Sequence, residues 1–165
     1  MKTDINKGYF NSYWPVECGG NRRQKIFNGS LNIKEKSHHL ITKVNNRWNV
    51  MFISRDDNEL YLAGTMPNFI GEKPFGWVQK VNPDNLETIY ESPNLKCGEH
   101  IWCGALAAHA NGTIINVNGS FMHILDDNCN IIKEIKLPID QAHNGRSEEH
   151  TSELQSPCNL VCRLL

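Results

Sequence analysis

The 165-residue chain lacks long hydrophobic runs, an excess of charge of either sign and any helical periodicity. No apolar run approaches the roughly 18 residues that a membrane-spanning helix needs. The start, MKTDINKGYF, has no apolar segment of the kind found in secretory signals. Lys and Arg number 17 against 18 Asp and Glu, which gives no electrostatic footprint for nucleic acid. We therefore expect a soluble, cytoplasmic protein with neither a membrane nor a nucleic acid as its partner.

Self-sufficient catalytic and metal-binding motifs are also missing. No HxxxH pair, glycine-rich phosphate loop or nucleophile elbow is present. The cysteines show no CxxC pair and no regular disulfide spacing, so we expect Cys18, Cys97, Cys103 and Cys129 to be reduced and buried. Any site must therefore be assembled from residues that lie far apart in the sequence.

What the sequence does contain is an apolar alternation of period two from Trp48 onward, interrupted by turn residues every eight to twelve positions. This pattern is typical of all-β proteins. It places Trp48, Val50 and Phe52 on one face of the first strand. The predicted strands span residues 48–54, 59–64, 76–81, 86–91, 104–110, 113–117, 121–125 and 131–137.

The predicted strands form a repeat. Residues 77–81 align with residues 121–125 at an offset of 44, and residues 62–64 align with residues 117–119 at an offset of 55. The difference is about the length of the insertion MPNFIGEKPF, which lies between the second and third strands of the first unit. A four-stranded unit that repeats at about 44 residues is the period expected of propeller blades.

We therefore predict an all-β fold, an incomplete β-propeller of about three four-stranded antiparallel blades. The small residues of the 104–110 segment suit an innermost strand, because neighbouring blades approach closely there. An ordinary antiparallel sandwich is the alternative, since the same turn spacing fits it. The predicted blades span residues 1–44, 45–95 and 96–139, and a further blade begins at 140–145.

The last twenty residues differ in character from the rest of the chain. The run RSEEHTSELQS, residues 146–156, resembles a translated sequencing adapter, and residues 157–165 resemble its usual continuation. This resemblance implies that residues 146–165 are a non-native tail and that the natural reading frame stops at about Gly145. His150 and the Cys158/Cys162 pair would then carry no function. A natural amphipathic C-terminus is the alternative.

Two residues suggest a metal site. Propellers bind ligands where the innermost strands of several blades converge, and Glu17 and Asn144 are separated by 127 residues, about three repeat periods. Glu17 in WPVECGG and Asn144 in AHNG make the chain resemble the gluconolactonase/senescence-marker-protein family of six-bladed propellers. The resemblance implies that both residues bind a divalent cation used in lactone hydrolysis. Carboxylate and amide oxygens suit calcium.

Four further residues are candidates. His143 and His100 are the predicted catalytic residues, because imidazole is the commonest acid or base near neutral pH. Arg22 and Arg23 follow a Gly-Gly pair and are predicted to bind the carboxylate or phosphate of a substrate. For each candidate a purely structural role is the alternative: a hydrogen-bonded loop, a solvated turn or a residue that stabilises a turn.

Two functions follow from these predictions. The first is a fragment of a β-propeller protein that acts as a metal-dependent lactonase or esterase-like hydrolase. The second is a non-catalytic propeller that binds a small molecule or a partner protein. A quinone-dependent dehydrogenase is a weaker third candidate, because its tryptophan at a fixed place in each blade is not evident.

Overall fold

The computed structural model describes residues 8–19, 41–44, 47–56, 59–67 and 73–143. Over these residues the chain forms one short 3-10 helix and eight strands, and it has no helix long and apolar enough to cross a membrane. The elements are η1 (Glu17–Gly19), β1 (Trp48–Asp56), β2 (Glu59–Met66), β3 (Phe75–Val81), β4 (Thr88–Glu91), β5 (Cys103–Ala108), β6 (Ile114–Asn118), β7 (Phe121–Leu125) and β8 (Ile131–Lys136).

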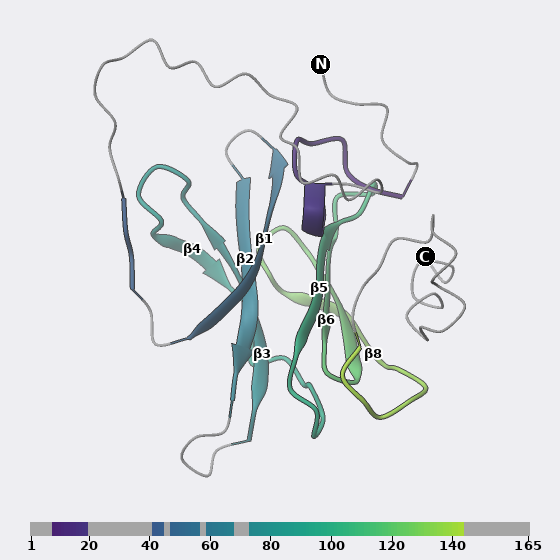
Figure 1. Cartoon of the computed structure of the whole chain (residues 1–165). Coiled ribbons are helices and arrows are strands. Elements are labelled where there is room, and N and C mark those ends of the chain that lie inside the picture. The colour runs from purple at the N-terminus through teal and green to yellow at the C-terminus, as the bar shows by residue number, and fades with distance from the viewer. Residues whose placement is uncertain (1–7, 20–40, 45–46, 57–58, 68–72, 144–165) are drawn as a thin grey trace.

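The strands make two four-stranded antiparallel sheets, and Figure 1 shows how the two sheets are arranged. The first has the order β1-β2-β3-β4 and the second the order β5-β6-β7-β8, so each sheet is a meander of consecutive strands. The predicted all-β class and the four-stranded antiparallel units are confirmed. The first sheet lies within residues 45–95 and the second within residues 96–139.

The two sheets are structural repeats of one another. The cross-strand pair Gly64 and Trp77 in the first sheet corresponds to the pair Asn118 and Phe121 in the second. Equivalent residues are therefore 54 positions apart in the first two strands, 44 apart in the third and 43 apart in the fourth. The predicted offset of 55 is wrong by one residue, because it matched Gly64 with Gly119 rather than with Asn118.

Both sheets also carry the same irregularity in their first strand. The register shifts between Asn49 and Met51 in β1 and between Cys103 and Ala105 in β5, at equivalent positions. Such a shift inserts one extra residue and bends the strand. A bulge kept at the same place in two sheets indicates that they share one strand geometry.

The bulge in β1 corrects the predicted faces of that strand. Trp48 pairs with Thr65, whereas Phe52 pairs with Leu62, and positions 65 and 62 of β2 lie on opposite faces because side chains alternate along a strand. Trp48 and Phe52 therefore do not share a face. The prediction is wrong because Val50, the extra residue of the bulge, breaks the period of two.

The main core lies between the two sheets. We call the face of the first sheet that carries Ile53, Tyr61 and Val78 face A, and the opposite face, which carries Leu62 and Gln79, face B. In the second sheet the equivalent residues of face A include Ala107, Ile115, Val117 and Met122, and those of face B include Leu106, Asn116 and His123.

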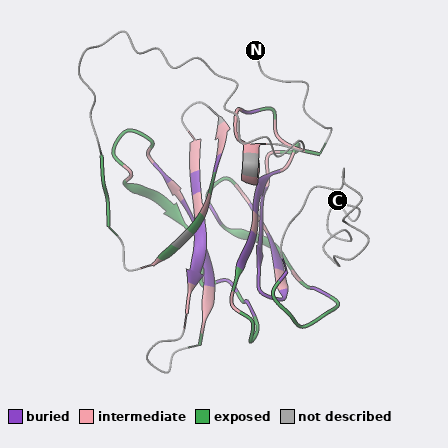
Figure 2. Ribbon diagram, viewed as in Figure 1, coloured by how far each residue is buried: buried purple, intermediate pink, exposed green. Residues whose placement is uncertain are grey.

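Face A of the first sheet packs against face B of the second. One buried cluster contains Ile53, Tyr61 and Val78 from face A together with Leu106 and Ile114 from face B. Burying each such aliphatic side chain contributes about 1.5 to 3 kcal/mol. Figure 2 shows the buried strands where the sheets meet, whereas β4 and β8 are largely exposed.

Face A of the second sheet takes part in a separate cluster. Ile115, Val117 and Met122 pack there with Leu137, which follows β8. In the second sheet, face B therefore packs against the first sheet, whereas face A packs against Leu137. The described thiols of Cys97, Cys103 and Cys129 are buried and reduced.

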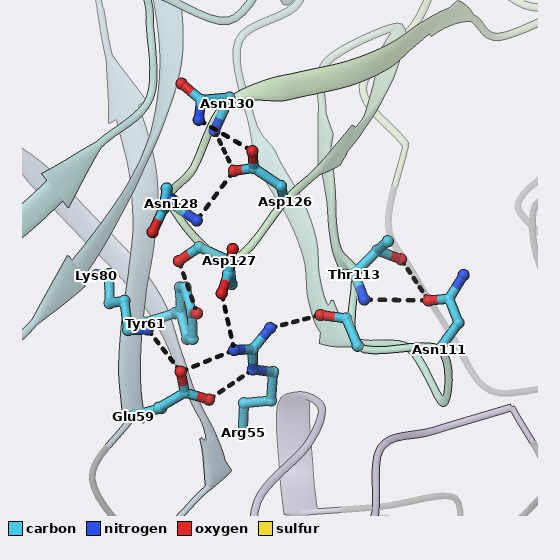
Figure 3. A network of polar contacts seen from close by, with 11 residues as sticks. Arg55, Glu59, Tyr61, Lys80, Asn111, Thr113, Asp126, Asp127, Asn128 and Asn130 are labelled. Atoms are coloured by element: carbon cyan, nitrogen blue, oxygen red, sulfur yellow. Dashed lines mark hydrogen bonds and ion pairs between the residues drawn. The ribbon is translucent and has the colours of Figure 1, made fainter.

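A polar network fastens the turns of the two sheets together, as Figure 3 shows. The Arg55 guanidinium donates to both carboxylate oxygens of Glu59, with N to O distances of 2.6 and 2.7 Å. Its Nη1 donates to the carbonyl of Gly112 in the second sheet at 2.6 Å. Lys80 also donates to Glu59, at 2.5 Å, and the hydroxyl of Tyr61 donates to the carbonyl of Asp127 at 3.1 Å.

We expect Arg55→Ala to lower the free energy of unfolding by about 2 kcal/mol. The variant loses the mostly buried ion pair with Glu59, and the carbonyl of Gly112 loses its donor. Lys80 would still neutralise Glu59, which limits the loss. Urea unfolding measures the change. Arg55→Lys keeps the charge without the planar fork and should recover only part of it; full recovery would contradict the role of the fork.

Candidate functional site

Residues 8–19, the N-terminal segment that the structure describes, lie across the first strands of both sheets. The backbone carbonyl of Trp14 accepts from the amide of Ser54 in β1 at 2.9 Å, and that of Pro15 accepts from the amide of Ala108 in β5 at 2.7 Å. The Trp14 ring stacks on Phe52 with centroids 5.8 Å apart. The segment therefore covers the edges of β1 and β5 that no other strand pairs within the described part of the chain.

This segment positions Glu17, the predicted metal ligand. Glu17 begins η1, a single turn that closes with a 2.9 Å hydrogen bond from the amide of Gly19 to the carbonyl of Val16. The turn packs against β1 and β5. Burial raises the pKa of Cys103 in β5 to about 12, and the negative charge of Glu17 adds to this rise. The carboxylate of Glu17 therefore lies within electrostatic reach of β5.

Both predicted histidines lie next to Gly119, in the turn between β6 and β7. His143 is 2% exposed, and its Nδ1 lies 3.2 Å from the carbonyl oxygen of Gly119. The backbone amide of His143 donates to the same oxygen at 3.1 Å. His100 is exposed, yet its carbonyl oxygen would lie 2.3 Å from a Cβ placed on Gly119. Both residues therefore surround a glycine that has no room for a side chain.

The remaining predicted site residues, Asn144, Arg22 and Arg23, lie outside the described residues. Over the described ranges, no three His, Cys, Asp or Glu side chains gather closely enough to hold a metal ion. Glu17 is thus the one predicted ligand among the described residues, and the turn that it begins packs against β1 and β5.

The sequence analysis missed a polar group on face B of the first sheet. Gln79 in β3 donates to Glu91 in β4 at 2.8 Å, and Arg47 donates to the other carboxylate oxygen of Glu91 at 2.5 Å. The Arg47 guanidinium also lies 5.6 Å from the centre of the buried Trp77 ring. A cation, a carboxylate and an N–H donor thus form a triad.

The second sheet carries an equivalent triad on its own face B. Nε2 of His123 in β7 lies 3.4 Å from Glu134 in β8, and Lys96 donates to the other oxygen of Glu134 at 2.7 Å. His123 stands at the position of Gln79, at the offset of 44. That spacing, combined with an acidic residue in each fourth strand, is the sequence signal that would have revealed both triads.

Burial and charge set the ionisation of the second triad. His123 is fully buried, and burial lowers the pKa of its imidazole, although the hydrogen bond to Glu134 opposes the effect. The hydrogen bond from Lys96 lowers the pKa of Glu134. At neutral pH these shifts favour a neutral imidazole and an ionised carboxylate.

No family model, curated protein or solved structure matches the chain.

We expect acid to weaken the contact between the sheets through His123. The folded protein holds the pKa of His123 below its ordinary value of 6.5, so the unfolded chain binds this proton more readily. The contribution to stability is complete above about pH 6.5 and is lost as the pH falls below that value. One such group changes the free energy of unfolding by at most about 1.4 kcal/mol per pH unit.

Urea unfolding between pH 7 and pH 5 measures this effect in the wild type and in His123→Gln. The variant copies Gln79 and keeps an N–H donor for Glu134, so its stability should fall less over this range. Equal pH dependence in both proteins would show that His123 does not contribute to the change of stability between pH 7 and pH 5. Effects below pH 5 belong to carboxylates such as Glu134.

Proposed function

We propose that β1–β4 and β5–β8 are two successive blades of a β-propeller. The observation that carries this proposal is that face A of one sheet packs on face B of its repeat. Contacts between unlike faces are head-to-tail, and their repetition generates a ring or an open array. Two sheets joined through the same face would instead complete a two-layer sandwich.

The two polar triads support the same proposal. The triad of the second sheet lies on the face that packs against the first sheet. The triad of the first sheet occupies the equivalent face, together with the buried Trp77. The first sheet therefore presents an interface of the same design on its face B, as expected of one blade within a series.

We propose further that residues 146–165 derive from a sequencing adapter and that the blade predicted at 140–145 continues in the natural protein. The support is the resemblance of RSEEHTSELQS to translated adapter sequence. Sequencing an independent copy of the gene past codon 145 should give a different continuation. The same eleven residues in an independent clone would refute the proposal.

The edges of β1 and β5 are the proposed place of the functional site. In a propeller the first strands of the blades surround the axis, and the segment that covers their edges carries Glu17. We infer that the protein is a metal-dependent hydrolase of lactones or esters, with Glu17 and Asn144 as ligands of a calcium ion. The ion would polarise a substrate carbonyl and lower the pKa of a bound water.

The other predicted residues take supporting roles in this proposal. His100, which is exposed, is the better candidate for proton transfer, because His143 is buried and bonded to Gly119. Arg22 and Arg23 would hold the acidic group of a substrate.

A non-catalytic propeller that binds a small molecule or a partner protein is the second candidate. The buried, hydrogen-bonded imidazole of His143 favours it, because this histidine supports a turn of the fold. Binding at the edges of β1 and β5 needs no general acid or base, and the proposed blade packing is the same.

We expect the full-length protein to bind one calcium ion and Glu17→Gln to weaken that binding at least tenfold, because the variant loses a charged oxygen ligand. Calorimetric titration with calcium chloride measures the affinity. Glu87→Gln, in the exposed turn before β4, is the matched control and should bind like the wild type.

Two results of this titration discriminate between the candidates. Wild-type binding by Glu17→Gln would remove Glu17 from the site. No calcium binding by the wild type, with no hydrolysis of a panel of lactones and esters, would exclude the hydrolase and leave the binding propeller.

A further inference from the structure

Three buried acceptor atoms on face B of the second sheet have no hydrogen-bond partner in the described part of the chain: Oδ1 of Asn118, Oδ1 of Asn116 and Nδ1 of His123. The last two belong to a directly paired couple of residues, Asn116 in β6 and His123 in β7. Both side chains are fully buried. They lie on face B of the second sheet, opposite the apolar face A of the first. Burying such atoms unpaired is costly, because each loses its hydrogen bonds to bulk water.

The contacts of Asn116 fix the orientation of its amide. Nδ2 donates to the carbonyl of Ala105 at 3.0 Å and approaches the Cys103 sulfur at 3.6 Å. A flipped amide would place its oxygen against the Ala105 carbonyl, where two acceptors repel. Oδ1 of Asn116 is therefore the atom that needs a donor.

The contacts of His123 fix its tautomer in the same way. Nε2 faces a carboxylate oxygen of Glu134 at 3.4 Å. Lys96 donates to Glu134 and keeps it ionised, and a carboxylate only accepts hydrogen bonds. Nε2 therefore carries the proton, and Nδ1 presents a lone pair.

The two residues are neighbours. Asn116 and His123 are directly paired across β6 and β7, so their side chains leave the sheet on the same face. The Cβ atoms of such a pair are about 4.5 to 5.5 Å apart. A molecule that donates two hydrogen bonds over a short span matches this arrangement.

We propose that one internal water molecule occupies this position and donates one hydrogen bond to Oδ1 of Asn116 and the other to Nδ1 of His123. Internal waters typically satisfy buried polar groups of this kind. A cation suits the position less well, because the nearby carboxylate of Glu134 is already neutralised by Lys96. The water is a polar bridge between β6 and β7 inside the contact of the two sheets.

The first sheet provides an internal comparison. The positions equivalent to Asn116 and His123 hold Leu62 and Gln79. Leu62 has no acceptor, so the first sheet has no equivalent bridge. Asn116→Leu therefore copies a residue that the repeat already accommodates, and it removes one of the two acceptors of the site.

NMR spectroscopy of the isotope-labelled chain tests the proposal with ordinary water as the probe. We expect long-lived water cross peaks to protons of Asn116 and His123, and a nitrogen chemical shift of His123 Nδ1 typical of an accepted hydrogen bond. Asn116→Leu should abolish the cross peaks, whereas Asn94→Leu at an exposed position should keep them.

Three results would overturn the proposal: a wild-type spectrum without long-lived water at this position, a proton on Nδ1 of His123, or unchanged water cross peaks in Asn116→Leu. The first two come from the wild type alone. The test therefore remains decisive if the Asn116→Leu variant does not fold.

Discussion

The packing of face A of the first sheet against face B of the second is the contact on which the rest of the structure depends. It joins Ile53, Tyr61 and Val78 to Leu106 and Ile114 in one core. The apolar face of a sheet must be buried against another element, so each sheet needs a partner. Because the contact uses face A of the first sheet and face B of the second, face B of the first sheet and face A of the second lie outside it. These two faces can pack on further neighbours in the same head-to-tail way, which is the basis of the propeller proposal.

Polar groups specify this contact where apolar packing alone would not. Asn118 reaches from face B of the second sheet to the carbonyl of Gly64, with a distance of 3.0 Å. A Cβ on Gly76 would meet the Asn118 side chain at 2.4 Å, so the sheets approach closely only because glycine stands there. Arg55 holds the turns at the other end through Gly112. These contacts fix the register of one sheet on the other.

Most strands were predictable from the sequence, because period-two alternation and turn residues are local signals. In the Asn111-Gly112 turn, for example, the amide of Thr113 donates to Asn111 Oδ1 at 3.0 Å, a contact between residues two positions apart. The bulge at Val50 was not predictable, because it depends on the partner strand. The roles of the candidate site residues stay predictions. His100 and His143 lie around Gly119 through contacts between residues 19 and 24 positions apart, which no local pattern reveals.

Methyl NOE spectroscopy tests the central claim, the contact of unlike faces, most directly. The account predicts cross peaks from Val78 and Ile53 to Leu106 and Ile114, and none from Val78 or Ile53 to Val117, which lies on face A of the second sheet. Cross peaks from Ile53 and Val78 to Val117, with none to Leu106 or Ile114, would show that the sheets pack through equivalent faces. That result would contradict the head-to-tail arrangement and the propeller inferred from it.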